Sequence, residues 1–490
     1  MTERGRSRDA GDPCWMSAGA LTACYAARTL SPVEATRATL ARIDALDPRI
    51  NAYCLVDHEA AMAAARASEA RWMQGTPLGR LDGVPASIKD LILTRGWPTL
   101  RGSRTIDPDQ PWEDDAPATA RLREAGAVLL GKTTTPEFGW RASTDSSLTG
   151  VTRNPWDTAL TPGGSSGGAA ASVAAGMGAL AVGTDGGGSI RIPAAFTGTV
   201  GIKPQFGRVP AWPASPMGTV AHLGPHARTV ADAAAMLDVL ARPDPRDGWS
   251  LAPTDRAHAL AAFAPGRDDA PPDLRGVRIA YSPTLGYVDC LDPEIANALD
   301  TAARTFEELG AIVEQKDPGF PDCHDTFLVH WMASARVMVQ KLPPAKRALL
   351  DPGLVAATED AARYTLADFL EAQDQRLRIS IAMRQLALTH DLLLTPATAL
   401  LPFETGLVAP PPEGRTRRAV APFDWTWWTP YSTPFNLSQQ PAVVLPCGRS
   451  ASGLPIALQL VGRHHDEAAC IAAGAAYEAA THWHRAAPPC

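Results

Sequence analysis

The chain has 490 residues, of which 45% are hydrophobic and 20% are charged, and its net charge is −7. These proportions are typical of a globular protein and exclude a disordered chain. The negative net charge, without any basic cluster, argues against nucleic acid or an anionic membrane surface as a partner.

The eight cysteines are widely spread and form no Cys-x-x-Cys motif, which favours reduced thiols over a disulfide framework or a zinc site. The apolar run from residue 167 to residue 183 consists mostly of Ala and Gly, and it is too weakly hydrophobic to span a membrane. We therefore expect a soluble protein of the cytoplasm.

The N-terminal residues 17–75 have a helical pattern, with a capping-box-like start from Ser31 to Glu34. Two short apolar runs, residues 81–89 and 127–131, predict buried strands. Residues 116–126 lie between these runs and predict a helix that ends at a glycine. A strand, a helix and a strand in this order favour an α/β fold with a mostly parallel sheet.

Two glycine-rich stretches, each centred on serine, follow in the chain. The first is TPGGSSGGAAAS, residues 161–172, and the second is GTDGGGSIRIPA, residues 183–194. Gly-Ser clusters are usually flexible linkers, but linkers do not usually lead into helix-forming sequence. Here residues 168–181 predict a helix of small residues packed closely against the sheet, which favours a site over two linkers.

The second half of the chain is less distinctive. Residues 265–275 resemble a surface linker, and residues 277–283 and 292–310 predict a strand and a helix. Helices and proline-rich loops are expected over residues 320–423. Five aromatic residues then fall within nine positions, 423–431. Two strand-like segments, 442–448 and 455–462, and a closing helix complete the chain.

Gly163–Gly167 matches G-x-S-x-G, the nucleophile elbow of α/β-hydrolases, which also requires an acid and then a histidine later in the chain. Four later histidines keep this alternative open: His464, His465, His482 and His484. Gly176–Ala181 matches a dinucleotide-binding fingerprint, but it follows a helix and lacks the expected ribose-binding acid. No segment has the ligand spacing of a zinc site.

A serine nucleophile without histidine needs another base, and a lysine can serve only when it is neutral. At an ordinary pKa of about 10.4, neutralising a lysine at pH 7 costs roughly 4.6 kcal/mol. Full burial can lower a lysine pKa by about 3–5 units, which is enough to cover that cost. Lys89 ends an apolar run, whereas Lys132 opens a turn and Lys203 lies near Arg208, so Lys89 is the candidate base.

Three motifs in order, residues 83–90 (GVPASIKD), 161–176 and 183–204, together resemble the signature of the amidase signature family. The resemblance extends over roughly residues 17–480. It implies an α/β amidase signature fold, with a central, mostly parallel mixed β-sheet covered by helices on both faces.

The resemblance also implies how the chain is organised. We expect a single amidase domain over residues 1–490. Within it, residues 17–75 form an N-terminal helical segment and residues 80–265 form the signature core. Residues 320–430 form a variable region that builds the substrate pocket.

By motif match, the resemblance implies a Ser-Ser-Lys triad. Ser189 is the nucleophile, Ser165 is the bridging serine in a cis peptide, and Lys89 is the terminal base. The glycines around Ser165 permit such a loop. We expect no metal and no cofactor.

The resemblance further implies supporting groups around the triad. The backbone N–H groups of Gly186, Gly187, Gly188 and Ser189 are expected to form the oxyanion hole. Ser166 is expected in the same hydrogen-bond network, and Asp185 and Arg191 are expected to hold the loop. Six aromatic residues are candidates for an apolar substrate pocket, although they could instead fill a core: Phe327, Trp331, Trp425, Trp427, Trp428 and Tyr431.

These expectations predict an amidase that hydrolyses the C–N bond of small hydrophobic or aryl amides, and also aryl esters and carbamates. Its partners would be the amide and water, with no nucleic acid and no membrane, and it would be a monomer or homodimer. One alternative is the glutamine-hydrolysing component of a transfer-RNA amidotransferase, which works with partner chains. Residues 363–386 lack that branch's double tyrosine, and residues 433–442 depart from its usual sequence. The other alternative, an inactive binding homologue, conflicts with the intact Lys89, Ser165 and Ser189.

Overall fold

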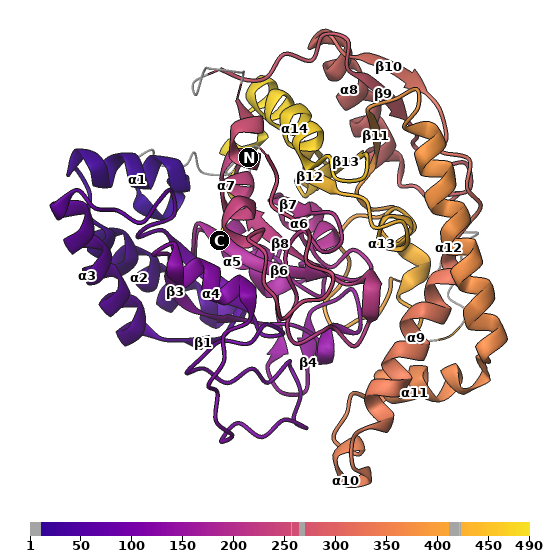
Figure 1. Ribbon diagram of the computed structural model, residues 1–490, viewed down its shortest axis with the longest axis horizontal. Helices are drawn as coiled ribbons and strands as arrows, with labels where there is room; N and C mark the ends of the chain where they lie inside the picture. Colours follow the sequence, from indigo (N-terminus) through magenta and orange to yellow (C-terminus); the bar gives the residue numbers. More distant parts are fainter. Residues whose placement is uncertain (1–10, 256, 264–269, 411–420, 422) are drawn as a thin grey trace.

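Figure 1 shows a sheet that runs across the molecule with helices packed along it. The computed structural model describes residues 11–255, 257–263, 270–410, 421 and 423–490. Among these residues, eleven strands form one sheet. Its strands are, in spatial order, β1 (Tyr53–Val56), β3 (Val128–Thr133), β2 (Pro85–Lys89), β6 (Leu180–Asp185), β8 (His222–Ala227), β7 (Val200–Lys203), β12 (Ala442–Arg449), β13 (Pro455–Gly462), β11 (Leu392–Pro396), β9 (Arg278–Tyr281) and β10 (Ile312–Gln315). The strands β4 (Asp145–Ser146) and β5 (Gly150–Val151) pair only with each other in the described part.

The sheet is mixed. Strands β3, β2 and β6 are parallel neighbours, and so are β11, β9 and β10. The strands between these two blocks pair antiparallel, as does β1 at the edge. A short turn at residues 450–454 joins β12 to β13, and strands joined in this way can only be antiparallel. The α/β fold with a mixed sheet is confirmed, and the predicted parallel pairing holds for the two outer blocks.

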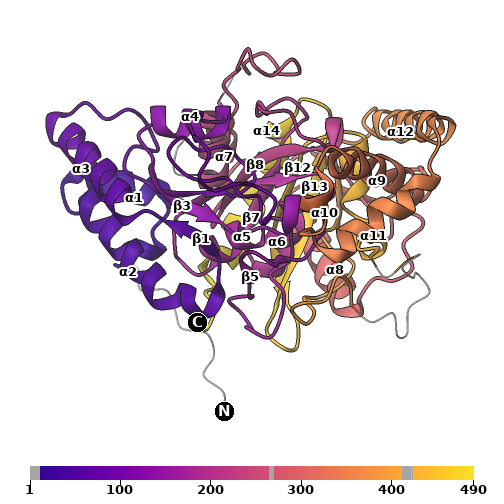
Figure 2. The same cartoon turned by 90° about the horizontal axis from the view of Figure 1, so that it is seen from below.

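Helices cover both faces of the sheet. Neighbouring residues of one strand point to opposite faces, and they belong to two different hydrophobic cores. Val443 and Leu445 of β12 belong to one core, and Ala442 and Val444 belong to the other. The first core contains residues of α4 (Pro117–Glu124), α7 (Val230–Leu240), α8 (Pro293–Glu308) and α14 (Glu467–Thr481). The second contains residues of α6 (Arg191–Thr197), α9 (His324–Gln340), α11 (Pro352–Asp360), α12 (Leu366–Leu386) and α13 (Thr433–Leu437). Figure 2 shows α4 and α7 on one side of the strands and α6 on the other.

The N-terminal segment contains α1 (Ala18–Ala27), α2 (Pro32–Ile50) and α3 (His58–Gln74). The predicted capping box is confirmed, because Glu34 N–H donates to Ser31 Oγ and Ser31 N–H donates to Glu34 Oε2. The helical pattern missed β1, which lies between α2 and α3. Asn51 ends α2 in the left-handed conformation and turns the chain into this strand.

The sequence placed the predicted helix of small residues correctly but overestimated its length. It forms α5 (Gly167–Ala174), and the chain has entered β6 by residue 180. Gly176 and Gly178 have φ values of +71° and +145°, which cannot continue a helix. The short helix α10 (Pro344–Arg347) precedes α11. Part of the predicted linker, residues 265–269, lies outside the described residues.

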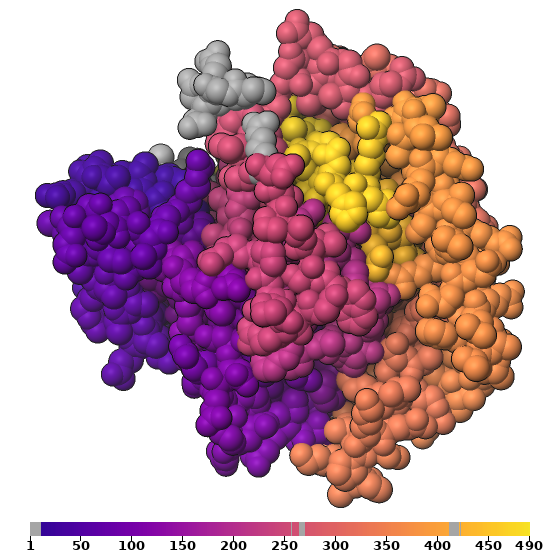
Figure 3. All heavy atoms as spheres, viewed as in Figure 1, coloured from indigo at the N-terminus to yellow at the C-terminus, as the bar shows by residue number. Residues whose placement is uncertain are grey.

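The N-terminal residues (indigo) and the region of α12 (orange) lie on opposite sides of the face in Figure 3, with residues near 200–250 between them. The division into an N-terminal segment, a signature core and a pocket region stays a prediction. Within the described residues, no helix is both long and apolar enough to cross a membrane.

Candidate active site

Ser165 and Ser166 lie directly before α5, and the Gly164–Ser165 peptide bond is cis. Neighbouring backbone leaves no room for larger residues here. A Cβ on Gly164 would lie 2.6 Å from the carbonyl oxygen of Ser143, and one on Gly168 would lie 2.5 Å from the carbonyl oxygen of Ala52. The glycines around Ser165 therefore allow a tightly packed loop rather than a flexible one.

Lys89 is the last residue of β2 and is fully buried. Its Nζ lies 2.6 Å from Ser165 Oγ, 2.9 Å from Ser166 Oγ and 2.8 Å from Thr184 Oγ1. Burial lowers the pKa of Lys89 well below its ordinary value, and the negative charge of Asp185 opposes this only partly. The contact with Ser165 Oγ, and not the lowered pKa alone, makes Lys89 the candidate base, since other buried lysines also have lowered pKa values.

Ser166 lies in the same network, as the sequence analysis expected. Its Oγ accepts from Thr184 N–H at 3.2 Å and donates to the Thr184 carbonyl oxygen at 3.0 Å. Its backbone N–H donates to the Ser189 carbonyl oxygen at 3.1 Å. Ser166 thus connects the loop before α5 to β6 and to the loop that carries Ser189.

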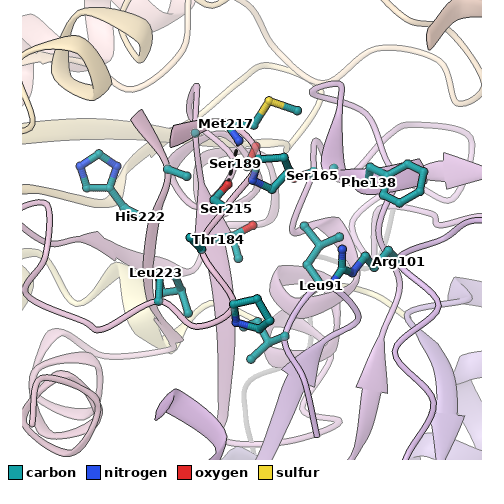
Figure 4. Close-up of a pocket in the computed structure, with 18 of the residues that line it drawn as sticks. Leu91, Arg101, Phe138, Ser165, Thr184, Ser189, Ser215, Met217, His222 and Leu223 are labelled. Carbon is teal, nitrogen blue, oxygen red and sulfur yellow. Dashed lines mark hydrogen bonds between the residues drawn. The ribbon is translucent and has the colours of Figure 1, made fainter. Parts of the chain in front are cut away.

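Ser189 lies between β6 and α6, and it lines the same cavity as Ser165 (Figure 4). Ser165 is 2% exposed and Ser189 is 4% exposed. The structure therefore brings Lys89, Ser165 and Ser189 together from three separate parts of the chain.

Asp185 and Arg191 form an ion pair at the two ends of this loop, and both side chains are fully buried. The Asp185 carboxylate accepts from Arg191 Nε at 3.0 Å and from Nη2 at 2.9 Å. Arg191 also donates to Asn436 Oδ1 and to Gln459 Oε1. Burial raises the pKa of Asp185, but the charge and hydrogen bonds of Arg191 outweigh it and hold this pKa well below its usual range.

The three glycines between Asp185 and Ser189 present backbone N–H groups near the cavity. None of the described residues accepts a hydrogen bond from the N–H of Gly186, Gly187 or Ser189. The sequence analysis expected Gly188 to be a fourth oxyanion donor, but its N–H already donates to Asp185 Oδ1 at 2.8 Å. The prediction for Gly188 is therefore wrong in this conformation, since the carboxylate that fixes the loop occupies its donor.

The aromatic residues predicted to line the pocket mostly do not do so. Trp331 lines the cavity, whereas the other five are buried in the core beside α6 and α9: Phe327, Trp425, Trp427, Trp428 and Tyr431. Trp331, Phe327 and Trp425 form a cluster with ring centroids 5.6–6.0 Å apart. Their large apolar surfaces pack against one another and the glycine loop, so the alternative that they fill a core is correct for five of them.

The cavity has a volume of about 160 Å³. Most of its wall is formed by residues 211–217 and by other side chains that were not predicted to line the pocket, among them Leu91, Arg101, Phe138, Thr184, His222 and Leu223. Figure 4 shows these residues around the two serines. Residues 211–217 contain two prolines, and the Trp212–Pro213 bond is cis. This proline-containing stretch follows the third motif, residues 183–204, and it was the sequence feature from which the cavity wall could have been predicted.

The nucleophile-elbow alternative required a late histidine near Ser165. None of the four candidates, His464, His465, His482 and His484, is among the described residues that line the cavity. His222 does line it, but burial lowers the pKa of His222 well below its ordinary value, and its Nδ1 faces the carbonyl oxygens of Val220 and Asp185. Within the described ranges, no cluster of three or more His, Cys, Asp or Glu side chains could hold a metal ion.

Comparisons with known proteins identify relatives along nearly the whole chain. A family model described as Amidase matches residues 34–471. The chain is 37% identical to the A subunit of the glutamyl-tRNA(Gln) amidotransferase of Chloroflexus aurantiacus, covering 96% of this chain and 97% of that protein. It is 35% identical to an acylamidase of Rhodococcus erythropolis, covering 96% of both chains.

A solved structure of a bacterial aryl acylamidase superposes with a TM-score of 0.86 at 32% identity, over 96% of this chain and 97% of that one. The fold and these relatives define a hydrolase that acts on amides. The chain belongs to the amidase signature family.

The Asp185–Arg191 pair generates a prediction on stability. Asp185→Asn keeps the shape of the side chain but leaves the buried charge of Arg191 uncompensated. We expect the free energy of unfolding to fall by about 3–5 kcal/mol, measured by chemical denaturation. The matched control is Asp273→Asn, which removes the partner of Arg275 in an exposed pair and should leave the denaturation midpoint unchanged. Equal midpoints for Asp185→Asn and the wild type would contradict the prediction.

Proposed function

We propose that this amidase hydrolyses small amides that carry an apolar group of about the size of one aromatic ring, through an acyl-enzyme on Ser189. The observation that carries this proposal is the fully buried Lys89, whose Nζ lies 2.6 Å from Ser165 Oγ at the cavity that Ser189 lines. The similarity to an acylamidase and to an aryl acylamidase supports the same substrate class.

The hydrogen bonds around Lys89 can accommodate a neutral amine that accepts the proton of Ser165. A neutral amine has two N–H donors and one lone pair, and three hydroxyl groups surround Nζ. Ser166 Oγ already donates to the Thr184 carbonyl oxygen, so it can only accept from Lys89. If Thr184 Oγ1 accepts the second N–H, Ser165 is left to donate to the lone pair.

The first half of the reaction has two steps, and in each step Ser165 relays a proton between Lys89 and the reacting groups. Ser165 passes its proton to Lys89 and takes the proton of Ser189, whose oxygen attacks the amide carbonyl carbon. The C–N bond of the tetrahedral intermediate then breaks, and the leaving amine takes a proton that returns from Lys89 through Ser165. The product of this half is the acyl-enzyme.

Water completes the cycle by the same relay. Its oxygen attacks the acyl carbon while its proton passes through Ser165 to Lys89. The bond to Ser189 then breaks, Ser189 recovers a proton, and the carboxylic acid leaves. In both halves, the free N–H groups of Gly186, Gly187 and Ser189 are the proposed oxyanion donors, and such donors contribute several kcal/mol to catalysis.

The size of the cavity limits the substrate. An apolar protein cavity of about 150 Å³ holds one benzene molecule, and this cavity has about 160 Å³. The wall includes the apolar side chains of Leu91, Phe138 and Met217. One aryl ring or a comparable aliphatic group fills this space. Aryl esters and carbamates belong in the same substrate screen, because they pass through similar tetrahedral intermediates.

The similarity to an amidotransferase component supports a second candidate, the hydrolysis of glutamine within a larger assembly. Glutamine carries an α-ammonium group besides its α-carboxylate, and a buried cation needs an acidic partner. No Asp or Glu is among the described residues that line the cavity. We therefore favour small amides over glutamine as the substrate, and we propose that the enzyme acts without partner chains in the cytoplasm. Release of ammonia from glutamine by the purified chain, faster than its hydrolysis of an aryl amide, would reverse this preference.

The proposal predicts which serine is acylated. A fluorophosphonate reagent should add to Ser189, and Ser189→Ala should abolish both labelling and amide hydrolysis. Peptide mass spectrometry of the labelled protein checks the site, and Ser172→Ala, a buried serine of α5, is the matched control. An adduct on Ser165 would exchange the roles of the two serines. Absence of any adduct would favour the inactive binding homologue.

The lowered pKa of Lys89 predicts the pH dependence of activity. Because the neutral amine is the base, kcat/KM should rise as the pH increases through the pKa of Lys89, and then level off well below pH 10. Lys89→Ala should lower kcat/KM at least about a hundredfold, and its residual activity should lack this rise. Lys316→Ala, at an exposed lysine, should keep the wild-type profile. The same profile in Lys89→Ala would show that another group is the base.

The proposed chemistry uses two serine hydroxyl groups, backbone donors and a buried amine, so it leaves no step for a metal ion. We expect dialysis against a strong chelator to leave the hydrolysis of an aryl amide unchanged. The test is the rate before and after dialysis and after addition of zinc. A loss of activity that zinc restores would contradict the Ser-Ser-Lys mechanism.

A further inference from the structure

Arg101 is the one residue with a permanently charged side chain among the described residues that line the cavity. It lies in the loop between β2 and α4, with φ at +56°. Its carbonyl oxygen accepts from Phe138 N–H at 2.8 Å, which fixes its backbone against a second wall residue. Figure 4 shows its side chain beside Leu91 and Phe138, directed toward the cavity.

The guanidinium of Arg101 carries five N–H donors. None of the described residues accepts a hydrogen bond from it or forms an ion pair with it. The nearby carboxylate of Asp90 is already engaged, because it lies 3.5 Å from Lys132 Nζ and accepts from Gly102 N–H. Burial lowers the pKa of Arg101, and Asp90 opposes this only partly.

Arg101 is partly buried, and its guanidinium has no partner among the described residues at a largely apolar wall, so it is available to bind an anion that enters the cavity. Arginine is also suited to this task, since its planar guanidinium binds a carboxylate through two parallel hydrogen bonds.

We propose that Arg101 binds a carboxylate on the substrate, so that the preferred substrates are amides bearing an anionic group. The inference rests on the proposed function and narrows it. Because Ser189 and Arg101 line the same small cavity, one small substrate can carry both the amide that reacts and the carboxylate that binds. A para-substituted aryl amide has this arrangement.

The test compares matched pairs of amides that differ only in charge. The first pair, 4-acetamidobenzoate and 4-acetamidobenzamide, carries the group on the leaving amine. The second pair, N-phenylsuccinamic acid and N-phenylsuccinamide, carries it on the acyl side. For the pair that matches the site, the anionic member should have a kcat/KM about ten- to hundredfold higher than the neutral one, as expected for a charge-assisted hydrogen bond.

Two arginines of the same loop give the matched variants. Arg101→Gln should reduce the anionic-to-neutral ratio of kcat/KM to near one, and Arg101→Lys should restore part of it. Arg104 is exposed and donates to the Ser147 carbonyl oxygen, away from the cavity, so Arg104→Gln should keep the wild-type ratio. Ratios near one in the wild type for both pairs, or an unchanged ratio in Arg101→Gln, would overturn the inference.

A second readout does not depend on turnover. Benzoate should slow the labelling of Ser189 by an uncharged fluorophosphonate more than benzamide does, and Arg101→Gln should remove this difference. If Ser189 is labelled but benzoate protects no better than benzamide, the inference about Arg101 is wrong and the proposed function stands. If Ser189 is not labelled and no amide is hydrolysed, the proposed function itself fails.

Discussion

The buried ion pair of Asp185 and Arg191 is the interaction on which the site depends. It connects the end of β6 to the start of α6, and the serine between them lines the cavity. Arg191 also donates hydrogen bonds to Asn436 in α13 and to Gln459 in β13, so one guanidinium joins elements that are distant in the sequence. Two opposite charges without water are stable only when every hydrogen bond is satisfied, and here the carboxylate also accepts from Gly188 and Ile190.

The glycine loop is held from outside as well as from its ends. A Cβ on Gly186 would lie 2.5 Å from Trp331, and one on Gly187 would lie 2.6 Å from Phe327 and 2.8 Å from Trp425. The aromatic rings therefore pack directly on bare backbone, and larger residues would push either the rings or the loop out of place. Aromatic residues far along the chain therefore contact the loop that precedes Ser189, although only Trp331 of this cluster lines the cavity.

The sequence predicted the parts of the site that are local in the chain. Lys89, Ser165 and Ser189 lie in continuous motifs, and the capping box of α2 also depends on neighbouring residues. It could not decide whether Trp427 and Trp428 face a ligand or a core, because an aromatic side chain serves both and only tertiary packing separates them. The antiparallel middle of the sheet and the cavity wall formed by residues 211–217 were also missed, because both depend on contacts between segments that are distant in the sequence. The bond between Gly188 and Asp185 also depends on loop geometry that composition does not encode.

Burial acts on the two basic residues of the site in opposite ways. A lysine that loses contact with water can release its proton, and Lys89 has the lowered pKa that follows from its full burial. An arginine does not release its proton in a protein, so Arg101 keeps its charge at the wall of the cavity and requires an anion to balance it. The same low polarity therefore gives a base in the proposed mechanism and a binding group in the proposed substrate preference. An arginine at position 89 could not become neutral and so could not serve as the base, whereas a lysine at position 101 would keep a charge but lose the two parallel hydrogen bonds that a guanidinium offers a carboxylate.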